Sequence, residues 1–256
     1  MELVPFILVL NRLMKLRLKL VIFSLLFSTA ANAQNWGGGV DDEPLHFGFT
    51  FQYISSEYKI LKKSDWQEPF EDPEGLVGAT SRLRSISSSP SPGFGIGFVV
   101  NKRLGENADV RFTPVLVFND RSINYQYADQ ADDNIKKVQT TLVEFPLGIK
   151  IKSNRRNNYR AYILGGAKYS ADISSKKKTN NALVTDPKEK WLNNERKYLS
   201  YEAGFGLDLY FEYFKMSPEI KLSYATNNAL VDEPTRYAAP IDRLMLRHVT
   251  FSLFFE

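Results

Sequence analysis

Apolar and polar residues alternate along most of the chain with a period of two. Every second residue of 46–53 is aromatic, and the residues between them are small or polar. Residues 93–100 repeat the pattern, with glycines on the face opposite the apolar side chains. A period of two indicates a β-strand whose faces meet different surroundings. Eight strands of this kind are predicted, at 46–58, 93–101, 109–119, 138–152, 159–173, 198–212, 218–225 and 245–255.

The links between these strands alternate in length. The long, polar links are 59–92, 120–137, 174–197 and 226–244, and the short ones are 102–108, 153–158 and 213–217. An outer-membrane barrel has long loops outside the cell and short turns in the periplasm, whereas a soluble Greek-key sandwich has no reason to alternate its links. We therefore predict an all-β fold over 46–256: an eight-stranded antiparallel transmembrane β-barrel with short periplasmic turns and long extracellular loops.

Outward aromatic residues gather near the predicted strand ends, as expected of the girdles of such barrels. Toward the outside these are Tyr53, Phe94, Phe118, Tyr169, Tyr201 and Tyr224, and toward the periplasm Phe47, Phe112, Tyr159, Phe211 and Phe255. Two prolines, Pro114 and Pro146, fall inside predicted strands. A closed barrel has no edge strand to hide a missing N–H, so we expect a bulge or a local kink there.

The N-terminal region has the pattern of a secretory signal peptide. Basic residues precede an apolar run at 20–27, and an Ala-x-Ala sequence ends at Ala33. We predict a cleaved signal peptide over 1–33, with Met14 as an alternative translation start. Residues 34–45 would then form a periplasmic N-terminal arm. The predicted location is the cell outer membrane.

Charge and composition exclude several classes of function. The formal net charge is +4, of which +3 lies in residues 1–33, so that the mature chain carries +1. This balance excludes nucleic acid as a partner. The chain has no cysteine, which excludes disulfides and thiolate metal sites. We expect no cofactor and no metal site.

Charged residues occupy the polar face of the predicted strands. They are Arg111, Glu144, Lys150, Arg160, Lys168, Glu202, Asp208, Glu219 and Lys221. Side chains fill a barrel of eight strands, and a buried charge without a partner is costly. We therefore predict a structural network of paired charges in the lumen. Catalysis or transport is the alternative, but no acid–base constellation points to it.

The histidines argue against an enzyme. A lipid-modifying barrel would need a histidine, alone or paired with a serine, at the membrane surface. The only histidines, His46 and His248, fall on neighbouring strands at positions roughly 20 Å apart, at about 3.3 Å per residue. We expect each to fill the lumen or its rim.

The long loops offer two candidate contact features. The link 174–197 is basic, which suits the phosphates of lipopolysaccharide, although an ordinary solvated loop is the favoured explanation of such charge. Trp66 and Trp191 also lie in long loops, where an exposed tryptophan is unusual without a packing or binding role. Outer-membrane lipid and lipopolysaccharide are therefore the expected surroundings.

Several segments resemble a known family. They are Asp-Glu-Pro-Leu-His-Phe-Gly-Phe-Thr at 42–50, Pro-Gly-Phe-Gly-Ile-Gly at 92–97, Val-Arg-Phe-Thr-Pro at 110–114, Leu-Val-Glu-Phe-Pro-Leu at 142–147, Asn-Asn-Tyr-Arg-Ala-Tyr at 157–162, Gly-Gly at 165–166 and Tyr-Phe-Lys-Met-Ser-Pro-Glu-Ile-Lys-Leu-Ser at 213–223. Together they resemble the PorT family of outer-membrane barrels from the Bacteroidetes. The segment 213–223 is the most specific, whereas Glu-Phe-Pro-Leu is widespread in related barrels.

The resemblance implies a non-enzymatic component of the type IX secretion system, needed to export surface proteases or the adhesins of gliding motility. It brings no catalytic motif. Other secretion components are the implied partners, and the candidate contact residues are Tyr213, Phe214, Lys215, Met216, Ser217, Pro218 and Glu219. A general surface barrel for adhesion or membrane integrity is the alternative, followed by a lipid-modifying enzyme.

Overall fold

The computed structural model describes residues 43–71, 79–174, 181, 184, 186 and 188–256. The predicted signal peptide and most of the predicted arm lie outside these residues. The described strands all belong to one compact unit, Gly37–Glu256. Within the described part, no helix is both long and apolar enough to cross a membrane.

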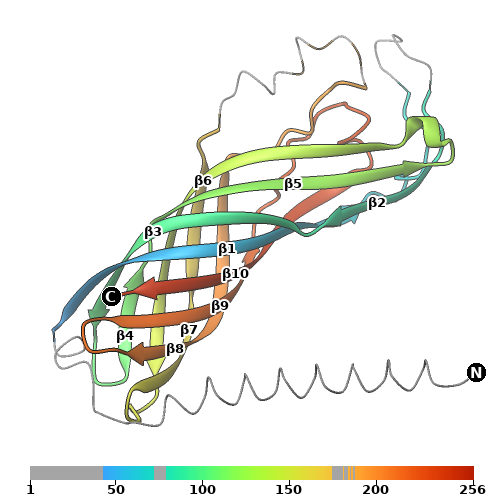
Figure 1. Cartoon of the computed structure of the whole chain (residues 1–256). Helices are drawn as coiled ribbons and strands as arrows, with labels where there is room; N and C mark the ends of the chain where they lie inside the picture. The colour runs from blue at the N-terminus through green and yellow to red at the C-terminus, as the bar shows by residue number, and fades with distance from the viewer. Residues whose placement is uncertain (1–42, 72–78, 175–180, 182–183, 185, 187) are drawn as a thin grey trace, which may run out of the picture. The chain divides into compact units, whose positions relative to one another are not determined.

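The unit is built almost wholly of antiparallel strands (Figure 1). Its elements are β1 (Leu45–Lys62), β2 (Leu83–Ser89), β3 (Ser91–Arg103), β4 (Ala108–Phe112), β5 (Val115–Tyr127), the 3-10 turn η2 (Gln130–Asp132), β6 (Asn134–Lys152), β7 (Tyr159–Asp172), β8 (Lys197–Tyr210), β9 (Lys215–Ala225) and β10 (Ile241–Phe255).

The sheet closes on itself. β1 pairs with β10 on one side and with β3 on the other, and each remaining strand pairs with its neighbours around the wall. Only Pro90 separates β2 from β3, and only Thr113 and Pro114 separate β4 from β5. The ten strands therefore occupy eight positions around the wall. The predicted eight-stranded antiparallel barrel is confirmed, with two of its strands interrupted.

The wall is not closed evenly along its height. β1 pairs with β3 only as far as Ser56, and from Glu57 onward it pairs with β10 alone. β2 pairs with β5, and no ladder joins it to β1 among the described strands. We call this stretch without a ladder, between residues 57–62 of β1 and β2, the seam; Tyr58 N donates to Ser88 Oγ across it at 3.0 Å. The seam lies at the long-loop end of the wall.

Several strands are longer than the alternation predicted, so that some of the predicted links were too long. The link 59–92 contains β2, and the link 120–137 is mostly strand, because the alternation continues through Ile123, Tyr125 and Tyr127. These side chains point inward and are buried, although the polar residues between them suggested a loop. In Figure 1, β5 and β6 run well past the end of β3.

The two prolines are accommodated without a bulge, contrary to expectation. Phe112 faces Leu147 and Val115 faces Glu144, so the register between the two strands passes Pro114 unchanged. Its carbonyl accepts a hydrogen bond from Phe98 N at 3.0 Å. β6 runs through Pro146 without interruption, and the Pro146 carbonyl accepts from Thr113 N at 3.0 Å. Only the interruption between β4 and β5 marks the missing N–H.

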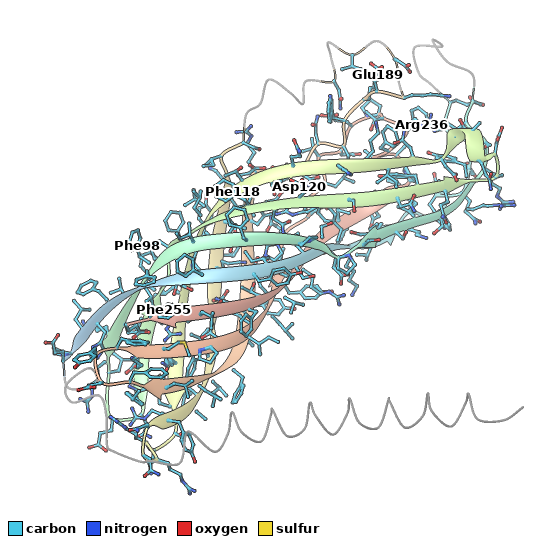
Figure 2. All side chains as sticks on the ribbon, viewed as in Figure 1. Phe98, Phe118, Asp120, Glu189, Arg236 and Phe255 are labelled. Atoms are coloured by element: carbon cyan, nitrogen blue, oxygen red, sulfur yellow. The ribbon has the colours of Figure 1, made fainter. Side chains whose placement is uncertain are left out.

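Outward and inward faces differ as the alternation predicted. Phe98 is 70% exposed, whereas the next residue, Val99, is 1% exposed. Figure 2 shows Phe98 and Phe118 projecting from the outer surface of the wall. Phe118 stacks on Phe94 across the strand pair, with ring centres 5.0 Å apart. A barrel with an apolar exterior is suited to lipid, and its polar groups must then be satisfied inside.

Candidate functional site

Ion pairs line the interior of the barrel. Six lumen cations each meet a carboxylate, in the pairs Arg111–Glu219 (3.0 Å), Lys215–Glu256 (2.8 Å), Lys150–Asp208 (2.7 Å), Lys152–Asp109 (2.7 Å), Lys168–Glu144 (3.0 Å) and Lys221–Glu202 (3.1 Å). Every one of these side chains is at most 6% exposed. These side chains lie in the interior because each occupies an inward position in the alternation of its strand.

Arg111 is the centre of the largest group. It binds Glu219 and also Glu256, at 3.2 Å, and its Nε donates to Asn101 Oδ1 at 2.8 Å. Its guanidinium lies 4.4 Å from the ring centre of Phe254. The Tyr162 hydroxyl donates to Glu219 at 2.9 Å. Five strands thus meet at this point, and their side chains close the lumen.

A second group lies farther from the short turns. Lys168 donates to Glu144, which also accepts from Ser170 Oγ at 3.2 Å. His248 Nδ1 lies 3.2 Å from Lys168 Nζ. His248 faces Ser56 in the β-ladder, ten residues along β1 from His46. The two histidines are therefore about 33 Å apart at about 3.3 Å per residue, farther than the roughly 20 Å expected, and share no site.

The structure places most of the predicted lumen charges together and adds others. Arg160 is half-buried and lies opposite Asp208 in the ladder. The additions are Asp109, Lys152, Lys215, Glu256 and Arg121. The alternation could have found Asp109 and Lys152, which share a face with Arg111 and Lys150. Arg121 was missed because it lay in a supposed loop.

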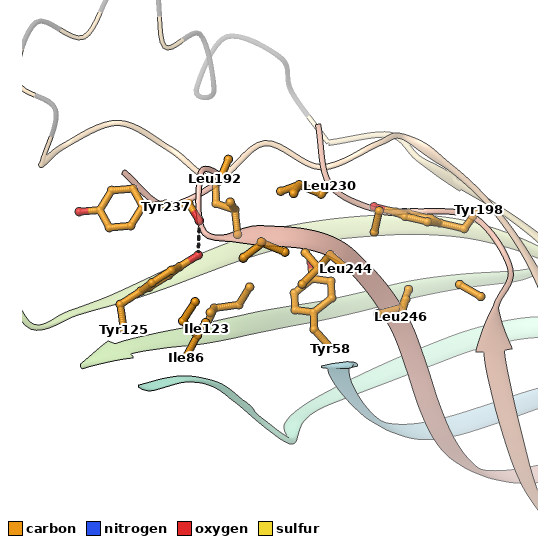
Figure 3. Close-up of a cluster of buried hydrophobic side chains, with 14 of the residues drawn as sticks. Tyr58, Ile86, Ile123, Tyr125, Leu192, Tyr198, Leu230, Tyr237, Leu244 and Leu246 are labelled. Atoms are coloured by element: carbon orange, nitrogen blue, oxygen red, sulfur yellow. Dashed lines mark hydrogen bonds between the residues drawn. The ribbon is translucent and has the colours of Figure 1, made fainter. Parts of the chain in front are cut away.

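The interior near the long loops is apolar instead (Figure 3). Side chains of β1, β2, β5 and β10 meet loop residues Leu192, Leu230 and Tyr237. Tyr125 Oη donates to the Tyr237 carbonyl at 2.8 Å, and Tyr237 Oη donates to the Lys188 carbonyl at 2.8 Å. Burial raises the pKa of Tyr237 to about 12, which keeps this hydroxyl a donor. The long loops are thereby packed over the end of the barrel.

The two loop tryptophans differ in their surroundings. Trp66 is half-buried and carries Lys62 Nζ 3.8 Å above its ring, whereas Trp191 is 42% exposed. The Asn181 side chain accepts a hydrogen bond from Trp191 N and donates one to the Trp191 carbonyl. The lysines at 176–178, the centre of the basic loop, lie outside the described residues.

The segment from Tyr213 to Glu219 is only partly a turn. β9 begins at Lys215, and the Lys215, Ser217 and Glu219 side chains point into the lumen, where none is more than 2% exposed. These three side chains are therefore not accessible at the surface, unlike the rest of the predicted contact set. Met216 and Pro218 are half-buried on the outward face. The turn itself exposes Tyr213, at 85%, and Phe214, at 40%.

Comparisons with known proteins agree with this architecture. Residues 32–231 match the family model described as outer membrane protein beta-barrel domain. No curated protein matches the chain. Among solved structures, the outer membrane protein OprG from Pseudomonas aeruginosa is 10% identical with a TM-score of 0.42, covering 81% of this chain and 93% of its own.

Two further structures are similar at the same level. Ail, the attachment invasion locus protein of Yersinia pestis, is 11% identical with a TM-score of 0.36, covering 82% of this chain and 96% of its own. The outer membrane protein AlkL is 10% identical with a TM-score of 0.34, covering 82% and 87%. The family match, which spans most of the chain, decides the assignment. The chain belongs to the outer membrane protein beta-barrel domain family and is a protein of the outer membrane.

Proposed function

We propose that this barrel is a non-enzymatic component of the type IX secretion system that contributes a periplasmic contact rather than a channel. The resemblance of segment 213–223 to the PorT family supports the system, and the exposed aromatic turn within that segment supports the mode of action. Other secretion components are the proposed partners on the periplasmic side. Lipopolysaccharide is the proposed partner of the basic long loops.

The observation that carries the proposal is the exposure of the turn between β8 and β9. Tyr213 is 85% exposed at its tip. Phe211 and Phe214 stack beneath it with ring centres 4.8 Å apart, and Phe214 lies 6.3 Å from the Phe255 ring. Stacking holds the turn in one conformation, so little entropy is lost when a partner binds. Exposed tyrosine on a rigid support is typical of an interaction site.

The filled lumen supports a contact role over conduction. Arg111, Glu219 and Glu256 close the periplasmic half, and the packed loops cover the other end. Channels for polar solutes in this class need about 16 strands. Secreted proteins would therefore pass elsewhere in the apparatus.

The test is export of cargo in a strain that carries Tyr213→Ser. We expect secreted cargo to fall severalfold while the level of the folded barrel in the outer membrane stays normal. Leu104→Ser is the matched control, because Leu104 is 59% exposed in another short turn, outside the resembling segments. Normal secretion with Tyr213→Ser would contradict the proposal.

A deletion strain separates export from the alternative of envelope integrity. Loss of secreted cargo with an intact permeability barrier supports export, whereas leakage with normal secretion supports the general envelope role. The double variant His46→Gln and His248→Gln should leave export intact at normal barrel levels. Loss of export in that variant would instead favour a chemical step.

A further inference from the structure

Arg121 on β5 is the exception to the pairing of charges in the lumen. Its side chain is completely buried, at 0% exposure. Each of the six lumen cations described above has a carboxylate within 3.1 Å, but no carboxylate of the described residues is within ion-pair distance of Arg121. Asp120, its neighbour in sequence, lies on the opposite, outward face of the strand.

Tyrosines, rather than acids, surround this guanidinium. Nη1 lies at the limit of hydrogen bonding from the Tyr58 hydroxyl, at 3.5 Å. The ring centres of Tyr58 and Tyr198 are 5.6 and 5.7 Å from the guanidinium carbon. These contacts offset part of the cost of burial, but they do not cancel the charge.

Several hydrogen-bond donors at this point have no acceptor. Arg121 Nε and Nη2 are unpartnered, and so are Asn119 Nδ2 and the Tyr198 hydroxyl. Asn119 is the preceding inward residue of β5, about 6.6 Å along the strand. Its Oδ1 accepts a hydrogen bond from Ser56, which leaves the Nδ2 group as the free end. The Tyr198 oxygen faces the guanidinium and can accept a hydrogen bond from it, but no carboxylate offsets the positive charge of Arg121.

A buried charge with no partner costs several kcal/mol, and removing the partner of a buried pair is strongly destabilising. Water would satisfy the donors but would leave the charge uncompensated. We propose that Arg121, Asn119 and Tyr198 bind a monovalent anion, a halide or a carboxylate group, inside the barrel.

The surroundings favour a weakly hydrated, singly charged ligand. Arg121 lies level with Ser56, where the ion pairs end and the apolar cluster begins. Ile54 is the inward residue of β1 that precedes Ser56, and Leu246 of β10 lies opposite Tyr58; both are buried. A divalent anion such as sulfate would lose more hydration here than one guanidinium restores. The apolar side would also accept the short chain of a carboxylate.

The first test uses the purified full-length barrel in detergent. Thermal unfolding is followed in sodium chloride, sodium acetate or sodium sulfate at equal ionic strength. A ligand that binds only the folded state stabilises it in proportion to the logarithm of its concentration above Kd. Chloride, acetate or both should therefore raise the Tm of the unaltered barrel more than that of Arg121→Met, whereas sulfate, which stabilises folded proteins by exclusion from their surface, should affect the two alike. A rise of the Tm with chloride indicates a halide site, and a rise with acetate indicates a carboxylate site.

The second test locates the ion. Crystals soaked in sodium bromide should show an anomalous peak about 3.3 Å from Arg121 nitrogen atoms, the distance expected for a halide hydrogen bond. Arg121→Met should remove the dependence of the Tm on chloride or acetate, whereas Arg84→Met, at an exposed position of β2, should retain it. The crystal experiment needs no variant, so a poorly folding Arg121→Met leaves the test intact.

Two outcomes would overturn the proposal. In one, the Tm follows ionic strength alone and no bromide peak appears beside Arg121, in which case water fills the site. In the other, a bromide peak appears without any chloride or acetate dependence of the Tm, which means binding at crystal concentration only.

Discussion

At the scale of single residues, the lumen contains buried charged side chains, and a buried charge is tolerated there when it has a partner of opposite charge. Lys150 and Asp208 are both 0% exposed, and Asp208 also accepts from Ser217 Oγ at 2.6 Å. A buried pair of this kind contributes little more than an apolar pair of the same size, but a single survivor is costly. The network therefore specifies which side chains occupy the interior more than it adds stability.

Lys150→Met should lower the free energy of unfolding by about 3–5 kcal/mol, because Asp208 is left buried without its cation. The double variant Lys150→Met, Asp208→Leu should recover most of that loss. Arg243→Met serves as the control, since Arg243 and Asp242 form a pair that is more than half exposed and is expected to change stability by less than about 1 kcal/mol. Urea unfolding in detergent measures all three. A double variant as unstable as the single one would contradict the pairing argument.

Lipid-facing positions should reject charge. Phe98→Arg at the outward face of β3 should cost roughly 2–4 kcal/mol near the bilayer midplane and reduce barrel assembly. Leu104→Arg, in the adjacent short turn, should be tolerated, because its side chain lies outside the paired strands. Heat-modifiable migration on a gel reports the folded fraction. Full assembly of Phe98→Arg would mean that the faces are assigned the wrong way round.

A close approach between β7 and β8 depends on Gly206. A Cβ at this position would lie 2.4 Å from the ring end and hydroxyl of Tyr162, which donates to Glu219. Gly206→Ala should therefore displace Tyr162 and cost about 1–3 kcal/mol by overpacking. Gly165→Ala is the matched control, because nothing lies within 4 Å of a Cβ there. Equal unfolding midpoints for the two variants would contradict this account.

At the scale of elements, the alternation predicted where strands run but not where they stop. It identified all eight positions of the wall, because one face of each strand meets lipid and the other the lumen. It missed β2 and the extensions of β5 and β6. Above the paired wall the outward face meets water, so polar residues on that face resemble a loop.

The candidate site was also predicted only in part. Charges on the inward faces indicated a network, but its partners across the barrel depend on register, which the sequence leaves open. Lys215 was assigned to a link, 213–217, that proved three residues shorter at its C-terminal side, because β9 begins at Lys215. Arg121 was missed because the end of β5, on which it lies, was predicted as a loop.

Asp132, in the turn after β5, holds the segment that leads into the paired strand β2. Its carboxylate accepts from Ser81 N at 3.0 Å and from Ser81 Oγ at 2.8 Å. The backbone N–H of Ser81, followed by its hydroxyl and by Arg236 and Lys188, lowers the pKa of Asp132. A lowered pKa means that this carboxylate stabilises the attachment above its unfolded pKa, near 3.9, and that the effect is lost as pH falls through the folded pKa.

We therefore expect limited proteolysis near residues 79–82 to increase as the pH is lowered below about 4. Asp132→Asn should show the increased cleavage at neutral pH and little further change on acidification. An acid-stable protease is needed so that its own activity stays constant. Cleavage of the unaltered chain that does not depend on pH would contradict the role of Asp132.

At the scale of the whole molecule, the barrel is filled along its length. In planar bilayers it should show no steady conductance steps of the porin type, because side chains occupy the lumen of an eight-stranded barrel. The triple variant Arg111→Ala, Glu219→Ala, Glu256→Ala removes the periplasmic group as a unit and should produce measurable leak currents. Steady conductance by the unaltered barrel would contradict a filled lumen.

The position of the seam along the wall also indicates how deep the barrel lies in the membrane. Hydrocarbon offers no hydrogen bonds, so strand edges without a partner lie outside it. The ladder between β1 and β3 runs from Leu45 to Ser56. At about 3.3 Å per residue and a tilt of about 40°, its twelve pairs span about 30 Å, close to the roughly 25 Å apolar band of such barrels. The outer leaflet should therefore end near Ser56, which leaves the part of the apolar cluster around Tyr58, Ile123 and Tyr125 above the lipid, inside a wall whose outer face meets water.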